Sequence, residues 1–266
     1  MQLQAKKSLG QHFLIDENIL RRIAESADIR DGESVVEIGP GTGLLTKHLL
    51  AMPLAKLTAF ELDERAIPIL ESEYHDERFS VVHQDFLEVP LNDFSVSGKI
   101  NIIGNIPYYI TSPIVFKLLE ERESLRFATM LVQLEVAERL IGVPRTKAYG
   151  IPSVLTQCFA EVKMLFKVKA GAFRPAPNVD SAVLRFDFEN DFFTREKILP
   201  PRNFDDKKFS RLVRTLFAMR RKTIKNNLKA LDISNADESK LALFLPKRAE
   251  ELSVKEFLEF YRMLYS

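Results

Sequence analysis

The sequence predicts an α/β domain with a mostly parallel sheet, followed by a smaller domain built only of helices. Short apolar segments typical of buried strands alternate with helical segments through the first part of the chain. This alternation argues for a parallel sheet covered on both faces. After about Phe188 the extended segments stop and helical patterns follow. We therefore predict two domains, residues 1–189 and residues 190–266.

The first domain begins with a helix that Asp16 can cap, because an aspartate side chain accepts hydrogen bonds from the free N–H groups of a first turn. Two late strands, 162–168 and 182–188, alternate apolar and polar residues and are joined by the Pro-rich segment GAFRPAPNVDS. Between the first helix and these strands, periodicity predicts buried strands at 34–38, 56–61, 79–83, 99–103 and 127–133, and helices at 44–51, 64–73 and 112–121.

The second domain is predicted to be helical because its apolar residues recur at helical spacing. Helices at 210–219 and 223–231 each have an apolar stripe beside basic residues. Ser253 and Glu256 have the spacing of a capping box, in which each side chain bonds the backbone N–H of the other residue. A last helix is therefore predicted to begin at Ser253.

The composition is that of an ordinary globular protein. Of the 266 residues, 46% are hydrophobic and 28% are charged, so a sizeable core is expected. The single cysteine, Cys158, excludes a disulfide framework and a multi-cysteine zinc site, and fits a reducing compartment. The N-terminus lacks the apolar core of a signal peptide, and no apolar stretch approaches the roughly 20 residues that span a bilayer. We expect a cytoplasmic protein with neither a membrane nor a metal as partner.

The net charge is +1, but the sequence contains one segment rich in negative charge and one rich in positive charge. Ten acidic residues but only two basic ones lie between Glu61 and Asp93. Nine basic residues and no acidic one lie between Lys207 and Lys229. The basic segment can be a surface that binds a polyanion or simply the solvated face of a helix, and its charge alone does not decide between the two.

The segment VVEIGPGTG indicates a ligand-binding turn. Its three glycines follow a strand and precede a helix, where they permit a tight turn and let the backbone approach a ligand closely. Glu61 ends the next strand, where a carboxylate can accept hydrogen bonds from both hydroxyls of a ribose. The alternative is a loop that only needs to turn, but the position of Glu61 favours a ribose-bearing ligand.

The glycine spacing argues against NAD as that ligand. The dinucleotide fingerprint G-x-G-x-x-G needs a glycine where this chain has Leu44. The observed G-x-G-x-G spacing instead resembles motif I of S-adenosylmethionine-dependent methyltransferases. Asp85, after the third strand, is placed to accept the amino group of an adenine, although capping a turn would also explain it. Ligands of such sheets bind outside the carboxyl ends of the strands, where these residues would meet.

The tetrapeptide Asn105–Tyr108 follows the fourth strand and resembles motif IV of methyltransferases that modify exocyclic amino groups. The side-chain carbonyl of Asn105 and a backbone carbonyl at Ile106 or Pro107 can accept the two hydrogens of an adenine amino group. Proline keeps the loop rigid, and Tyr108 offers a face on which a base can stack. The alternative is an ordinary Asn/Pro turn with a core tyrosine.

Two more aromatic residues have open interpretations. Phe173, in the Pro-rich segment, can close the other face of a flipped base or can be a hydrophobic plug between domains. Tyr109 is expected to be structural rather than functional.

Eight stretches of the chain together resemble the ribosomal RNA adenine dimethyltransferase family, and within it the members that act on the small ribosomal subunit. The resemblance covers nearly the whole chain in the right order, which makes it far more specific than any single motif. The stretches are KSLGQHFL, VVEIGPGTGLLT, ELD, QDFLEV, NIPYYIT, AYG, AFRPAPNVDSAV and FAMRRKTIKNNL.

The resemblance implies a Rossmann-like class I methyltransferase with a seven-stranded, mostly parallel sheet and a helical C-terminal domain that binds RNA or the ribosome. It implies S-adenosylmethionine as cofactor and the small ribosomal subunit, with its rRNA, as partner. The implied reaction dimethylates N6 of two adjacent adenosines in a hairpin loop near the 3′ end of that rRNA. A monomer is expected.

The resemblance also assigns residues. The implied reaction site consists of Asn105, Ile106, Pro107, Tyr108 and Phe173. Ile106 stands where many members have Leu, and His12 where many have Asn, but backbone contacts there would preserve the chemistry. The implied cofactor contacts are His12, Leu14, Gly39, Gly41, Glu61, Asp85 and Asn105. The implied RNA contacts are Arg145, Lys147, Arg211, Arg214, Arg220, Arg221, Lys222 and Lys225.

Two other functions remain as alternatives. The first is a large-subunit rRNA adenine methyltransferase of the antibiotic-resistance type, against which the stretch FAMRRKTIKNNL argues. The second is a ribosome-assembly factor without catalysis, against which the intact Asn105–Tyr108 argues.

Overall fold

The computed structural model describes residues 3–6, 9–96, 98–228 and 241–265. The chain forms two compact units. The first consists of Met1–Ala137 and Val162–Glu189, and the second of Glu138–Glu161 and Asn190–Ser266. The structure thus differs from the predicted single boundary, because residues 138–161 belong with the C-terminal helices. The reason is packing: the ring of Phe159 contacts the rings of Phe204 and Phe209 within the second unit.

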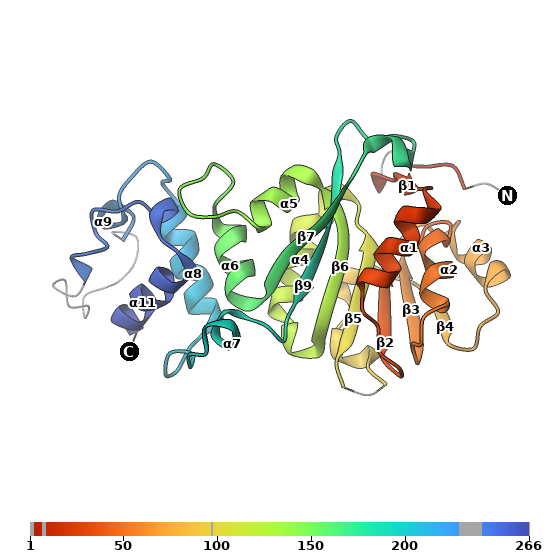
Figure 1. The fold of residues 1–266 in the computed structure, drawn as a ribbon, viewed down its shortest axis with the longest axis horizontal. Coiled ribbons are helices and arrows are strands. Elements are labelled where there is room, and N and C mark those ends of the chain that lie inside the picture. The colour runs from red at the N-terminus through yellow and green to blue at the C-terminus, as the bar shows by residue number, and fades with distance from the viewer. Residues whose placement is uncertain (1–2, 7–8, 97, 229–240, 266) are drawn as a thin grey trace. The chain divides into compact units, whose positions relative to one another are not determined.

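The first unit is built on a seven-stranded sheet with the order β4-β3-β2-β5-β6-β9-β7 (Figure 1). Strands β4 to β6 of this order pair in parallel, and β9 runs antiparallel to β6. The predicted seven-stranded, mostly parallel sheet is therefore confirmed. The strands are β2 (Ser34–Ile38), β3 (Lys56–Glu61), β4 (Phe79–His83), β5 (Ile100–Asn105), β6 (Leu125–Gln133), β7 (Glu161–Val168) and β9 (Ser181–Asp187).

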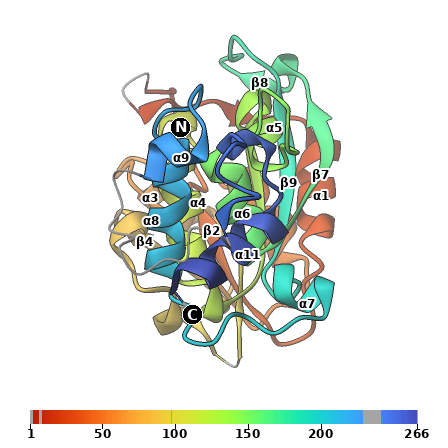
Figure 2. The same cartoon turned by 90° about the vertical axis from the view of Figure 1, so that its left-hand side faces the viewer.

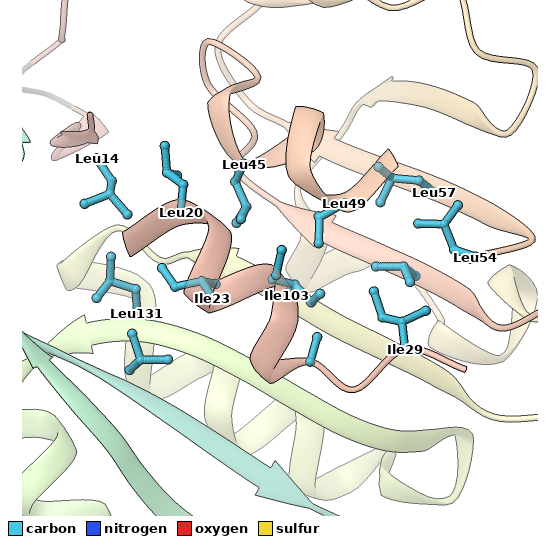
Figure 3. Close-up of a cluster of buried hydrophobic side chains, with 14 of the residues drawn as sticks. Leu14, Leu20, Ile23, Ile29, Leu45, Leu49, Leu54, Leu57, Ile103 and Leu131 are labelled. Carbon is cyan, nitrogen blue, oxygen red and sulfur yellow. The ribbon is translucent and has the colours of Figure 1, made fainter. Parts of the chain in front are cut away.

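Helices α1 (Glu17–Ser26) and α2 (Leu44–Leu50) pack on this sheet through one hydrophobic cluster. Figure 3 shows Leu20 and Ile23 of α1 in this cluster with Ile103 and Leu131 of the strands. The side chain of Asp16 caps α1 as predicted, since its Oδ1 accepts from the N–H groups of the second and third helical residues. The other helices of the first unit are α3 (Ile67–Glu73), α4 (Thr111–Glu120) and most of α5 (Leu134–Leu140).

Two features near the carboxyl ends of the strands differ from the prediction. Strand β5 continues through Asn105, two residues past the predicted end, so Gly104 and Asn105 belong to the sheet. A separate two-stranded antiparallel sheet joins β1 (Phe13–Leu14) to β8 (Phe173–Arg174). This pairing ties residues 9–14, here called the N-terminal arm, to the Pro-rich segment.

The second unit is helical. Its helices α6, α8 and α11 pack on one another, as Figure 2 shows. The predicted capping box is confirmed, because the N–H of Ser253 donates to Glu256 Oε2 at 2.8 Å and the N–H of Glu256 donates to Ser253 Oγ at 3.3 Å. The helices are α6 (Ile151–Phe159), α7 (Phe192–Glu196), α8 (Asp206–Phe217), α9 (Ile224–Asn227) and α11 (Val254–Tyr265).

Helix α8 begins four residues before its predicted start, because Asp205 caps it by accepting from the N–H of Lys208. Residues 229–231 of the predicted helix 223–231 lie outside the described residues. Within the described ranges, no helix combines the length and the apolar character that a membrane span requires.

Candidate active site

A cavity with about 750 Å³ of empty space, its open mouth included, lies at the carboxyl ends of β2, β3, β4 and β5. The N-terminal arm and the turn after β5 complete its lining. Parallel strands end at the same edge of a sheet, so residues far apart in the chain meet here. Nine predicted site residues line this cavity: His12, Gly39, Gly41, Glu61, Asp85, Asn105, Ile106, Pro107 and Tyr108.

The glycine turn after β2 has a conformation that requires glycine. Gly39, Gly41 and Gly43 all have positive φ, between 56° and 82°. A Cβ on Gly41 would lie 2.8 Å from the ring of Phe13, and one on Gly43 would lie 2.6 Å from the ring of Tyr74. The turn is therefore packed as well as bent, and its backbone directly borders the cavity.

The Glu61 carboxylate is held in place by backbone groups. Its Oε1 accepts from the N–H groups of Leu62 and Asp63, both at 2.8 Å, and its Oε2 accepts from Gly41 at 2.9 Å. Burial raises the pKa of Glu61, while these three hydrogen bonds oppose the rise. A carboxylate has about four lone-pair sites, so Oε2 can accept one further hydrogen bond from a ligand.

Asp85 both caps a turn and faces the cavity. Its Oδ1 accepts from the N–H of Leu87 at 2.9 Å, which explains the short 3₁₀ helix Phe86–Glu88. Its Oδ2 takes part in no hydrogen bond among the described residues. Turn capping and ligand binding are therefore compatible at this residue.

The amide of Asn105 has one fixed end and one available end. Its Nδ2 donates to the carbonyl of His12 at 2.9 Å, which leaves Oδ1 as an acceptor beside the cavity. The Pro107 carbonyl already accepts from the N–H of Ile110 at 3.1 Å. In the described part of the chain no hydrogen bond reaches the Ile106 carbonyl. Of the two predicted backbone acceptors, the Ile106 carbonyl is therefore the one available.

Tyr108 is fixed at both its hydroxyl and one ring face. Its hydroxyl lies 2.8 Å from Ser181 Oγ, and its ring stacks on that of His12 with centroids 5.7 Å apart. The ring of His12 is held in turn by Nδ1, which donates to the Pro175 carbonyl at 2.8 Å. Burial raises the pKa of Tyr108, so its hydroxyl is neutral and serves as an anchor.

The N-terminal arm has a second attachment that the sequence did not reveal. Gln11 Nε2 donates to Asp63 Oδ2 at 3.1 Å, and Lys6 Nζ lies 3.5 Å from Asp63 Oδ1. The side chain of Arg65 hydrogen-bonds the same carboxylate, and this contact lowers the pKa of Asp63 well below its ordinary value. Asp63 thus stays ionised and holds the arm over the edge of the sheet.

Glu37 is a buried carboxyl under the glycine turn that the sequence analysis also missed. It is 1% exposed, and Thr46 Oγ1 donates to its Oε2 at 2.7 Å. Burial raises its pKa from an ordinary value of 4.5 to about 8, with a further contribution from the negative charge of Glu61. The available signal was an acidic residue inside the otherwise apolar strand VVEI.

Two predicted site residues are placed differently. Phe173 is 0% exposed and belongs to the hydrophobic cluster with Leu14, so it does not line the cavity. A hydrophobic plug therefore describes Phe173 better than a partner for a flipped base. Leu14 is 4% exposed and borders a neighbouring smaller cavity together with Gly39 and Asn105. Tyr109, which was expected to be structural, is 58% exposed and lies at the lining of the cavity.

The basic residues of the second unit have different environments. Arg220 Nε donates to Glu250 Oε2 at 2.8 Å, and its Nη2 lies 3.0–3.3 Å from the carbonyls of Thr146, Lys147 and Tyr149. Its guanidinium therefore stabilises the loop before α6, and a direct phosphate contact would compete with these bonds. The other seven predicted RNA contacts are exposed: Arg145, Lys147, Arg211, Arg214, Arg221, Lys222 and Lys225.

No group of three or more His, Cys, Asp or Glu side chains within the described ranges is placed to hold a metal ion. The lining of the cavity offers carboxylates, an amide, backbone carbonyls and aromatic rings. Such groups can bind a nucleoside and orient an amino group.

Comparisons with known proteins identify the family of the chain. Residues 2–265 match the family model described as ribosomal RNA adenine dimethylase. Ribosomal RNA small subunit methyltransferase A of Chlorobaculum tepidum is 43% identical over 263 residues, which cover 98% of this chain and 90% of that relative.

Two solved structures share the fold. A dimethyladenosine transferase from Plasmodium falciparum superposes with a TM-score of 0.77 at 24% identity, covering 93% of this chain and 95% of that one. The 23S rRNA methyltransferase ErmE superposes with a TM-score of 0.70 at 27% identity, covering 96% and 100%. The fold is thus that of class I methyltransferases, and the extent of the family match means that this chain belongs to the ribosomal RNA adenine dimethylase family.

Proposed function

We propose that this protein transfers methyl groups from S-adenosylmethionine to N6 of two adjacent adenosines of small-subunit (16S) rRNA. The target is the hairpin loop near the 3′ end, and the product is a pair of N6,N6-dimethyladenosines made during ribosome biogenesis. The observation that carries the proposal is the convergence of Glu61, Asp85 and Asn105 on one cavity in a chain of this family. A relative 43% identical is named as a small-subunit methyltransferase.

The residues present fit S-adenosylmethionine. The cavity is lined by apolar side chains with a few fixed polar groups, as is typical of small-molecule sites. Glu61 would accept from the ribose, and Asp85 Oδ2 from the adenine amino group. His12, Leu14 and the glycine turn would border the rest of the cofactor. When bound, S-adenosylmethionine supplies an electrophilic methyl group.

The chain's own part in the reaction is to orient the target amino group. The nitrogen of an adenine amino group shares its lone pair with the ring, and is therefore a poor nucleophile. Asn105 Oδ1 and the Ile106 carbonyl are available to accept its two hydrogens, which would direct the lone pair out of the ring plane. Positioning and fixed dipoles supply catalysis of this kind. The proton of the methylated amine is acidic enough to leave to water.

Tyr108 would hold the base by stacking. His12 covers one face of its ring, so the base would use the other face or take the place of His12. The hydroxyl bond to Ser181 keeps the ring in its orientation in either case. Because Phe173 is buried, Tyr108 is the stacking residue in this arrangement.

The exposed basic residues of the second unit would bind rRNA phosphates. Such contacts give affinity and register without reading the sequence. A target base already unpaired in a loop is extruded at low cost. Arg221, Lys222 and Lys225 are the main candidates, and a ribosomal substrate fits the predicted cytoplasmic location.

The test is incubation of the purified protein with radiolabelled S-adenosylmethionine and small subunits that lack the modification. Digestion of the rRNA should yield labelled dimethyladenosine from the 3′ hairpin. Absence of label from subunits, with cofactor binding demonstrated in the same preparation, would count against the proposal.

The likeness to ErmE keeps one alternative open, which is methylation of large-subunit rRNA. Offering both subunits in one reaction separates the two: label in the large subunit alone would favour the alternative. A ribosome-assembly factor without catalysis would bind the small subunit but leave no label in either rRNA.

A further inference from the structure

Tyr109 is an exposed aromatic residue at the cavity that the proposed reaction does not use. Its side chain is 58% exposed, although it directly follows the half-buried Tyr108. Large aromatic side chains bury much apolar surface and are costly to leave in water. At this exposure the ring of Tyr109 is not packed in a core, and it is available at the lining of the cavity to a ligand.

The local fold explains why the side chains of Tyr108 and Tyr109 point in different directions. Residues Tyr108–Ile110 form a 3₁₀ turn, in which successive side chains point about 120° apart. Tyr108 reaches inward to Ser181, and Tyr109 is turned outward at the same edge of the cavity. The two rings thus follow each other along the chain, one anchored within the site and one at its opening.

The ring of Tyr109 is supported from one side by the N-terminal arm. Gly10, with φ of +59°, lies so close that a Cβ there would be 3.2 Å from the Tyr109 Cδ1. This contact covers part of the ring and leaves more than half of the side chain exposed. A ring that is supported in this way loses little conformational freedom when a flat ligand stacks on it.

We propose that Tyr109 stacks against the nucleobase adjacent to the target adenosine in the RNA strand. The inference rests on the proposed function. A base inserted at Asn105 and Tyr108 stays joined to its neighbour through one phosphodiester, so the neighbour must lie at the opening of the cavity. An unpaired nucleobase offers the flat face that an exposed aromatic ring binds. The ligand is thus a second, unpaired base of single-stranded RNA.

The test uses the full chain as wild type, Tyr109→Ala and Tyr109→Phe. Steady-state methylation of unmodified small subunits gives KM and kcat, and calorimetry gives the affinity for S-adenosylmethionine. Removal of a base–aromatic stack should raise KM for the subunit about 5- to 100-fold. Tyr109→Phe should behave as wild type, because the ring and not the hydroxyl binds. Cofactor affinity should change by less than about twofold, since no predicted cofactor contact is altered.

A second measurement observes the neighbouring base directly. A hairpin RNA with 2-aminopurine next to the target adenosine should lose fluorescence on binding wild type and Tyr109→Phe, but not on binding Tyr109→Ala. Val96→Ala is the matched control, because Val96 is 61% exposed and does not line the cavity.

Three outcomes overturn the inference. An unchanged KM and unchanged quenching in Tyr109→Ala would show that the ring does not touch RNA. A loss of cofactor affinity equal to the loss of activity would show that the ring only supports the arm. If wild type itself methylates neither subunit, the proposed function fails as well, so that failure is distinguishable from the other two.

Discussion

The turn after β5 and the basic segment of the second unit differ in how their polar groups are held. At the strand ends, backbone groups fix the candidate site side chains: Asn105 donates to the His12 carbonyl, and Glu61 nearby accepts three N–H groups. In the basic segment, Arg220 is bonded to a loop while its neighbours Arg221 and Lys222 face solvent. The end of a strand therefore fixes the position of a polar side chain. In the basic segment, by contrast, neighbouring side chains of the same charge have different environments.

The largest expected effect comes from Asn105, the proposed side-chain acceptor at the end of β5. Asn105→Ala should reduce methyl transfer about 100- to 1000-fold, the usual cost of deleting one fixed polar contact to a reacting group. Subunit binding, measured by sedimentation, should remain. Asn105→Asp keeps an acceptor oxygen but loses the donor to His12, so it should retain more transfer than Asn105→Ala and bind cofactor less tightly. Near-normal transfer by Asn105→Ala would contradict the mechanism.

Gly104→Ala tests the close packing of the strand that leads to the turn. A Cβ at Gly104 would lie 2.6 Å from the Ile38 carbonyl oxygen, so the strands must shift. We expect the free energy of unfolding to fall by about 1–3 kcal/mol in urea titrations, as for other overpacked sites. Gly171→Ala, where no atom lies within 4 Å of the new Cβ, should be nearly neutral. Equal stability of the two variants would contradict the packing argument.

Arg220→Gln and Arg221→Gln separate the two roles within the basic segment. Loss of the Arg220 bonds to Glu250 and to the loop carbonyls should lower the free energy of unfolding by about 1–3 kcal/mol. Arg221→Gln should change it by less than about 0.5 kcal/mol, because the exposed Arg221 side chain makes no hydrogen bond to the described residues, whereas the likewise exposed Arg220 does. Urea unfolding of both variants checks this, and a larger loss in Arg221→Gln would reverse the assignment.

Glu37→Gln should alter how stability depends on pH. Between pH 4.5 and about 8 the unfolded chain has ionised Glu37 while the folded chain still binds its proton. The wild type therefore loses up to about 1.4 kcal/mol of unfolding free energy for each pH unit in this window, and the variant lacks that loss. Unfolding at pH 5, 6, 7 and 8 should show the variant gaining on wild type as pH rises. The exposed Glu88→Gln is the control, and a constant difference for Glu37→Gln would contradict burial as the cause.

The smallest effect concerns salt. Replacing Arg221 and Lys222 by Gln should weaken binding to the subunit and reduce the slope of log affinity against log salt by about 2, since each phosphate contact contributes about 1. Affinity measured at several salt concentrations checks this. An unchanged slope would exclude these side chains from the RNA contact.

The sequence was sufficient for the sheet and for the residues at its strand ends. Gly39, Glu61, Asp85 and Asn105 each lie at the end of a strand or just after it, and parallel strands bring such positions together whatever the loops between them do. The attachment of the N-terminal arm could not be predicted in this way. Its hydrogen bonds to Asp63 and Pro175 join residues distant in sequence and leave no local pattern.

Other environments of the site residues could not be predicted from the sequence either, for similarly specific reasons. Tyr108 and Tyr109 are the same residue type at adjacent positions. The 3₁₀ turn turns their side chains apart, and this makes Tyr109 the exposed one. Phe173 was placed in the site by the family resemblance, but its strand pairing with Leu14 turns it into the core. Arg220 was indistinguishable from Arg221 until the loop carbonyls at Thr146 and Lys147 were located.

The pairing of β1 with β8 has a consequence for the order in which the protein is made. Chains emerge from the N-terminus, and domains fold as their parts become available. Phe13 and Leu14 are synthesised first, but their partners Arg174 and Phe173 follow long after Asn105. A nascent chain that already has the glycine turn, Glu61, Asp85 and Asn105 therefore still lacks the strand that its arm requires. The β1–β8 pairing that ties the arm beside the cavity can therefore form only after residue 174 has been made.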